Sequence, residues 1–174
     1  MRHRPTRAGG FAAATALFAI SLFVLIGVAA ANIAHDNARA QQFHAIREQM
    51  VAQRDLIFNL ILLCRTIYPA GNNGTGNHVQ YPATPADRQV AALTCPGQGF
   101  APIWSGDARA MAPRPLPGFN GWTYVNDSNS IRIQTTAVNP DSNWHRDLLD
   151  AVVARIGPGQ AVRSGNALTL TLIN

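Results

Sequence analysis

The stretch FAAATALFAISLFVLIGVAAA, residues 11–31, decides how this chain is organised. It is apolar or small throughout except for Thr15 and Ser21, and no charged side chain occurs between residues 8 and 34. About 20 consecutive apolar residues are enough to cross a hydrocarbon core of about 30 Å. We therefore expect residues 11–31 to form a membrane-spanning helix.

The basic residues around this stretch predict its orientation. Arg2, Arg4 and Arg7 precede it, and no matching cluster follows it. Positive charge is retained on the cytoplasmic side, so the N-terminus should lie inside and the rest of the chain should be exported. These three arginines also account for the fall of the net charge from +5 to +2 when residues 1–10 are left out. The other arginines are scattered rather than grouped, which disfavours nucleic-acid binding.

The helix is predicted to continue well beyond the apolar stretch. No proline occurs between Pro5 and Pro69. A stripe of apolar residues at helical spacing runs along the second half; it consists of Phe43, Ile46, Met50, Ile57, Ile61 and Cys64. Residues 56–63 are apolar almost all round, which predicts burial against a folded domain. We expect a membrane half at residues 11–31 and an amphipathic half at residues 32–68.

Residues 69–174 are predicted to form a small globular head. Residues 121–125 and 131–137 are rich in aromatic and β-branched residues and should pair as a hairpin. Residues 160–163 and 167–173 should form a second hairpin, because leucines alternate with threonines in the latter. Between the hairpins, Ser142 or Asn143 can cap a helix that ends at Ile156, before Gly157. The predicted fold class is α+β, with a long N-terminal helix packed on a small antiparallel sheet.

The segment before the first hairpin is less regular. Residues 82–117 are rich in proline, with a possible short helix at residues 85–93 that Thr84 would start. We expect this segment to wrap over the surface of the head. Cys95 lies within it, and pairing with Cys64 is the simplest reading for an exported protein. The alternative is that Cys64 is only a small buried hydrophobic residue.

The sequence contains no pattern that indicates catalysis. The histidines fall in separate segments without metal-ligand spacing, so we expect no metal site and no cofactor; they are His3, His35, His44, His78 and His145. Glu48 is the only glutamate, and the aspartates have no partner that favours acid–base chemistry over surface charge. Trp122 and Tyr124 are interpreted as core residues of the hairpin. We do not expect an enzyme.

The layout of the chain resembles the type IV pilin and pseudopilin family. A basic leader ends in Gly9 and Gly10, Phe11 opens an apolar segment, and one very long helix leads to a small head with two cysteines. The specific motif is Arg7-Ala8-Gly9-Gly10-Phe11. The resemblance implies that a prepilin peptidase cuts after Gly10 and that the new N-terminal residue, Phe11, is methylated.

The resemblance also implies a place and partners for the protein. It would be anchored once in a bacterial inner membrane, with its head in the periplasm or on an extracellular filament. Its partners would be membrane lipid, other pilin-like subunits, the peptidase and an assembly platform. The family usually has a glutamate four residues after the cleavage site, where this chain has Thr15. The lack of that carboxylate at a filament-core position suggests a minor subunit near the tip.

Two other readings of the N-terminal segment remain open. Residues 28–31, Val-Ala-Ala-Ala, precede Asn32 and offer a site for conventional signal peptidase. The chain would then be a secreted or periplasmic binding domain. Alternatively, the segment is not cleaved, and the protein is a single-pass member of an envelope complex.

Overall fold

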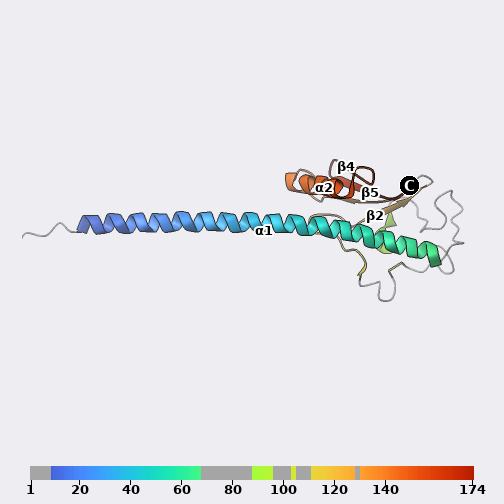
Figure 1. Cartoon of the computed structure of the whole chain (residues 1–174), viewed down its shortest axis with the longest axis horizontal. Helices are drawn as coiled ribbons and strands as arrows, with labels where there is room; N and C mark the ends of the chain where they lie inside the picture. Colours follow the sequence, from blue (N-terminus) through green and yellow to red (C-terminus); the bar gives the residue numbers. More distant parts are fainter. Residues whose placement is uncertain (1–8, 68–87, 96–102, 105–110, 128–129) are drawn as a thin grey trace, which may run out of the picture. The chain divides into compact units, whose positions relative to one another are not determined.

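The computed structural model describes residues 9–67, 88–95, 103–104, 111–127 and 130–174 of the chain. The side chains of residues 9–21, of Ile67 and of Arg88 lie outside the described part. The chain divides into two compact units, Met1–Phe43 and His44–Asn174. Helix α1, Gly9–Ile67, contributes residues to both (Figure 1).

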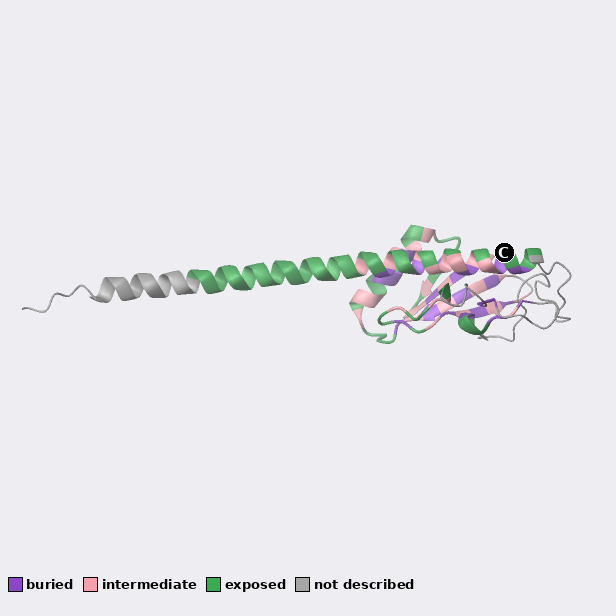
Figure 2. Ribbon diagram, turned by 90° about the horizontal axis from the view of Figure 1, so that it is seen from below, coloured by how far each residue is buried: buried purple, intermediate pink, exposed green. Residues whose placement is uncertain are grey.

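Helix α1 is 59 residues long, as the absence of proline and the near absence of glycine predict. Within the unit His44–Asn174, one side of this helix is buried, and Figure 2 shows these residues in purple on the side that faces the sheet. The buried residues are Ile46, Met50, Ile57, Ile61 and Cys64. The predicted apolar stripe is therefore confirmed as the contact between helix and head.

Residues 56–63 are buried against the head, as expected, but on one side of the helix only. Ile57 and Ile61 are 1% and 0% exposed, whereas Leu63 is 50% exposed. A helix that packs on one face of a sheet buries only the side that points at it, whatever the composition of its other sides. The apolar residues on the outer side therefore remain at the surface of this unit.

The described residues of the head form a five-stranded antiparallel sheet with the strand order β1-β2-β3-β5-β4. The strands are β1 (Arg88–Gln89), β2 (Thr123–Asn126), β3 (Ile131–Thr136), β4 (Ala161–Ser164) and β5 (Ala167–Ile173). Both predicted hairpins are present: β2 pairs with β3, and β4 pairs with β5. The central strands β3 and β5 also pair with each other, which joins the two hairpins into one sheet.

Alternation along the strands gives the sheet one buried face. In β5 the buried residues are Leu168, Leu170 and Leu172, and the intervening threonines are only partly buried. Ile131 and Ile133 of β3 and Tyr124 of β2 are fully buried as well. Because side chains of a strand point alternately to opposite faces, the leucine–threonine pattern determines which face meets α1.

Helix α2, Asn143–Ile156, has the predicted boundaries. The Ser142 side chain accepts a hydrogen bond from the backbone N–H of His145, 3.4 Å away, which satisfies one of the free donors of the first turn. Gly157 follows the last helical residue with φ +106°, a conformation that L-residues with a side chain rarely adopt. Leu148, Leu149 and Val152 form its buried face.

Part of the proline-rich segment differs from the expectation, whereas its residues 111–117 are exposed or partly exposed. Arg88 and Gln89 form strand β1 at the edge of the sheet, and residues Val90–Ala92 form a short 3-10 helix, η1, so the predicted helix is wrong there. Val90 donates a backbone hydrogen bond to the carbonyl of Trp122 at 2.8 Å. The indole N–H of Trp104 in turn donates to the carbonyl of Val90 at 2.8 Å. Both tryptophans are buried, so this part of the segment belongs to the core.

The predicted membrane half of α1 falls partly outside the described residues, since the side chains of residues 11–21 are not described. In the part of the chain that is described, no helix combines the length and the apolar character needed to cross a membrane.

The packing of α1 on the sheet can be tested with two substitutions on the same helix. Ile61→Ala removes a fully buried side chain and should lower the free energy of unfolding by about 2–5 kcal/mol, because it leaves a cavity. Leu63→Ala removes as many atoms from a half-exposed side chain and should cost about 1 kcal/mol or less. Urea unfolding of the full-length chain, followed by tryptophan fluorescence, measures both. Equal losses for the two variants would contradict the one-sided packing.

Candidate functional site

The residues predicted to be processed lie near the beginning of α1. Gly10, Phe11 and Thr15 are all within this helix, which begins at Gly9. Their side chains lie outside the described part of the structure. Their roles in cleavage, methylation and filament packing therefore stay predictions.

The two cysteines are brought together as expected. Cys64, near the end of α1, and Cys95 form a disulfide with their Cα atoms 5.6 Å apart. Both are buried. Closing a loop across 31 residues contributes about 3–4 kcal/mol to stability in the chain-entropy model. The bond holds the segment that carries β1 against the helix.

The described part of α1 within the unit Met1–Phe43 has an unusual surface. All residues from 22 to 42 are exposed, although many are large and apolar (Figure 2). The exposed large hydrophobic residues are Leu22, Phe23, Val24, Leu25, Ile26, Val28 and Ile33, at 48–75% exposure. Burial of one such side chain is worth about 1.5–3 kcal/mol. A contiguous surface of this kind therefore favours an apolar environment supplied by another molecule.

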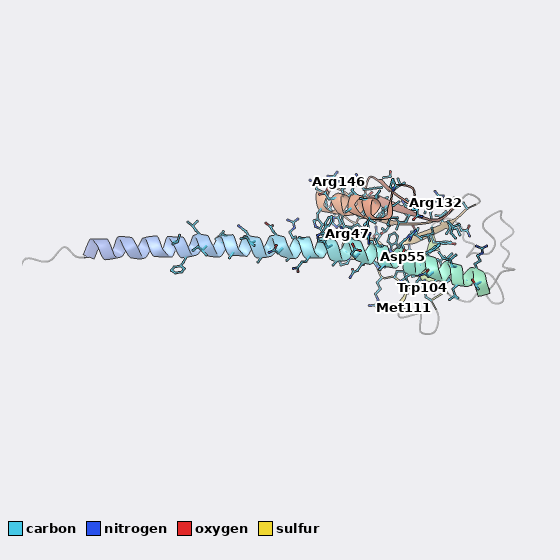
Figure 3. The ribbon with its side chains drawn as sticks, viewed as in Figure 1. Arg47, Asp55, Trp104, Met111, Arg132 and Arg146 are labelled. Carbon is cyan, nitrogen blue, oxygen red and sulfur yellow. A yellow bond between two sulfur atoms is a disulfide. The ribbon has the colours of Figure 1, made fainter. Side chains whose placement is uncertain are left out.

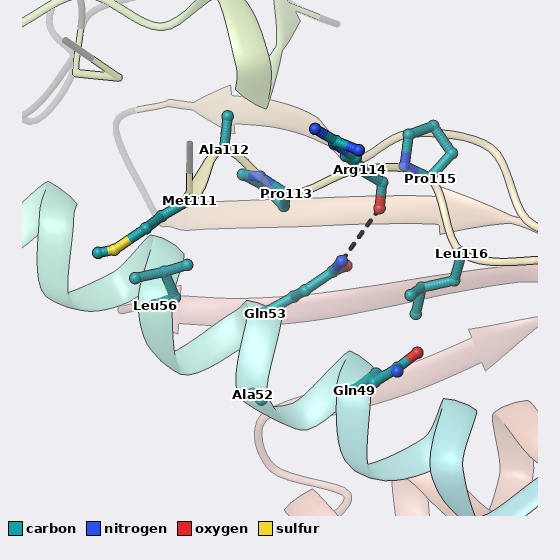
Figure 4. A pocket seen from close by; sticks show the side chains of 10 residues that line it. All are labelled: Gln49, Ala52, Gln53, Leu56, Met111, Ala112, Pro113, Arg114, Pro115 and Leu116. Atoms are coloured by element: carbon teal, nitrogen blue, oxygen red, sulfur yellow. Dashed lines mark hydrogen bonds between the residues drawn. The ribbon is translucent and has the colours of Figure 1, made fainter. Parts of the chain in front are cut away.

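A second feature lies within the unit His44–Asn174, where α1 faces residues 111–116 (Figure 4). These residues enclose an open groove of about 400 Å³. Gln53 lies at its floor and connects three elements. Its side-chain carbonyl accepts a hydrogen bond from the indole N–H of Trp122 at 2.6 Å, and its amide N–H donates to the carbonyl of Arg114 at 3.0 Å. The amide thus ties the helix to Trp122, which directly precedes β2, and to the loop.

Several charged groups of the head form ion pairs, and Figure 3 labels one member of three of them, Arg47, Asp55 and Arg132. Arg47 pairs with Glu48 at 2.7 Å and Arg54 with Asp55 at 2.8 Å. Further pairs join Arg132 to Asp127 and Arg163 to Asp150. The hydrogen bond from Arg163 to the Asp150 carboxylate raises the pKa of the guanidinium above its ordinary value, because it favours the charged form. Exposed pairs of this kind contribute little to stability.

Nothing in the described residues assembles a metal site: no three histidine, cysteine, aspartate or glutamate residues lie close enough together to hold an ion. Comparison of the chain with models of known families, with curated proteins and with solved structures found no match.

Gln53 was not singled out from the sequence, although a signal was present. It occupies a position of the apolar stripe, between Met50 and Ile57 at spacings of three and four. A polar residue at a buried helical position needs a buried partner, because an unpaired polar group in a core is costly. What the sequence could not supply was the identity of the partner, Trp122, which is 69 residues away.

The contribution of this tie can be measured with a matched pair of glutamines. Gln53→Ala leaves the buried Trp122 N–H and the Arg114 carbonyl without their partner, so it should lower the free energy of unfolding by about 1–3 kcal/mol. Gln49→Ala is the control, because Gln49 is exposed and lines the same groove; its effect should be within about 0.5 kcal/mol. Denaturant unfolding distinguishes the two. If Gln53→Ala is as mild as Gln49→Ala, the tie has no structural role.

Proposed function

We propose that this chain is a pilin-like or pseudopilin-like subunit of a membrane-anchored filament, with a structural role in assembly. The observation that carries the proposal is the run of exposed apolar side chains between Leu22 and Ile33 on a helix that belongs in its later part to a folded head. A helix with such a surface needs an apolar partner along its length. Lipid can supply it before assembly, and the same helices of other subunits can supply it in a filament.

The chemistry of the leader supports the same function. Residues 1–10 carry three arginines and end in Gly9-Gly10, and the apolar segment begins at Phe11. In this proposal a prepilin peptidase removes the leader, and an inner-membrane platform drives assembly. The subunit is anchored once in the bacterial inner membrane until it is assembled, with its head on the exported side. The head contributes contacts rather than catalytic groups, and the buried disulfide suits an oxidising compartment.

Within such a filament we assign the chain to a minor position at or near the tip. Cleavage after Gly10 leaves a charged amine on Phe11 in apolar surroundings, where an unpaired charge costs several kcal/mol. A carboxylate on the incoming subunit, in the family this chain resembles, neutralises the amine of the subunit added before it. Thr15 provides a hydroxyl but no charge. A first subunit has no earlier neighbour to neutralise, so it tolerates threonine at this position.

The processing step can be tested on the protein from native membranes. Mass spectrometry of the N-terminal peptide should find a chain that begins at Phe11 with a methylated amine. Gly10→Val is the control, and it should retain the leader because the bulkier side chain disrupts the cleavage site. A mature chain that begins at Asn32 would indicate a secreted domain, and one that begins at Met1 an uncleaved anchor. Either result would refute the proposed function.

The tip position can be tested by counting copies per filament. The parent chain should be present at one or a few copies, and Thr15→Glu should raise incorporation along the shaft because it restores the missing carboxylate. Thr15→Gln has the size of glutamate without its charge and should behave like the parent. Immunogold labelling or quantitative mass spectrometry of sheared filaments gives the number. A parent chain that already forms the shaft would contradict the tip assignment.

A further inference from the structure

The outward face of the sheet carries a row of uncharged polar side chains that crosses several strands. Gln89 of β1 is paired with Thr123 of β2, and Thr123 is paired with Gln134 of β3. Residues directly opposite on neighbouring strands share a face. Their neighbours in sequence, Val90, Tyr124 and Ile133, are buried, so the row points away from the core.

This row lines a second groove in the head, which we call the polar groove. Its volume is about 410 Å³, within the range of about 300–1,000 Å³ that is usual for small-molecule sites. The lining residues are Gln89, Asn120, Gly121, Thr123, Gln134, Thr135 and Thr136. All of them are uncharged, and every one except Gly121 has a hydroxyl or an amide in its side chain.

Some of these groups are already held by hydrogen bonds. The Thr123 hydroxyl donates to the carbonyl of Gln134 at 3.2 Å, and the Thr135 hydroxyl donates to the carbonyl of Asn120 at 2.6 Å. The Asn120 amide donates to the Thr136 hydroxyl at 2.7 Å. These bonds keep the floor of the groove in one arrangement. Preorganised polar groups of this kind lower the entropic cost of binding.

The two glutamines are different, because neither side-chain amide forms a hydrogen bond with any described residue. Each offers two N–H donors and one carbonyl acceptor. Their Cα atoms are two strand spacings apart, about 10 Å. The Gln89 carbonyl oxygen lies over Gly121, where an added Cβ would come within 3.1 Å of it. The two free amides therefore stand at separate points of the groove, and Gly121 lies beneath the Gln89 side chain.

We propose that the polar groove binds a neutral, polyhydroxylated carbohydrate. A sugar hydroxyl is both a donor and an acceptor, which matches a lining of amides and hydroxyls. An apolar ligand would leave the amides unpaired at a cost. An anionic ligand would call for arginine, and the arginine of β3, Arg132, pairs with Asp127 instead. The site is independent of the proposed filament role.

Saturation-transfer difference NMR and titration of the full-length chain can test this proposal. The detergent must lack a sugar headgroup, since a glycoside would compete for the site. The probes are maltotriose, cellotriose and triacetylchitotriose, with 6′-sialyllactose as an anionic comparison.

At least one neutral trisaccharide should bind saturably. Gln134→Ala should weaken that binding about tenfold or more, since one good hydrogen-bonding group is worth about 1.4 kcal/mol. Ser164→Ala, on strand β4 at the opposite edge of the same sheet, should change it by less than about twofold.

Several results would overturn the proposal. One is the absence of saturable binding by all three neutral trisaccharides at about 10 mM, which corresponds to a negligible affinity. A second is binding of 6′-sialyllactose with the same affinity as the neutral trisaccharides. A third is trisaccharide binding whose affinity Gln134→Ala leaves unchanged. A fourth is that no sugar binds the chain and Gln134→Ala changes its oligomeric state. That result would make the groove a contact between copies of the chain. Gln134→Glu is a second variant that keeps a side chain of the same size, and it should also weaken binding.

Discussion

Burial of one side of α1 against the sheet is the interaction on which the head depends. Met50 and Ile61 of the helix and Leu168 and Leu170 of β5 are all fully buried, yet helix and strand are more than one hundred residues apart in sequence. Neither layer could bury its apolar face alone, since a sheet with one apolar face needs a second layer. The disulfide and the Gln53 hydrogen bonds then hold the irregular segments in place around this contact.

The same helix presents two different surfaces. Ile57 and Ile61 are buried inside the head, whereas Leu25 and Ile26 in the unit Met1–Phe43 are 67% and 56% exposed. The first surface is satisfied within the chain, and the second is not satisfied by any residue that the structure describes. The proposed assembly with other apolar surfaces rests on this contrast, because burial of exposed aliphatic groups is favourable.

Polar side chains in the head have two separate uses. Gln53 is partly buried, and its hydrogen bonds to Trp122 and Arg114 replace those that water would make. Gln89 and Gln134 lie on the outer face of the sheet, where their amides have no protein partner in the described part. The same residue type thus serves as a structural tie in one place and lines the proposed binding groove in the other, and the presence of a protein partner for the amide distinguishes the two.

Local patterns in the sequence were sufficient to predict α1, the boundaries of α2, both hairpins and the buried leucines of β5. Each of these depends on periodicity or on a capping residue within a few positions, so the sequence alone determines it. The strand order, the two-residue strand β1, the buried position of Trp104 and the partners of Gln53 depended on the tertiary structure. They arise from contacts between distant segments, and no local pattern records which distant segment will complete a core or pair with an edge strand.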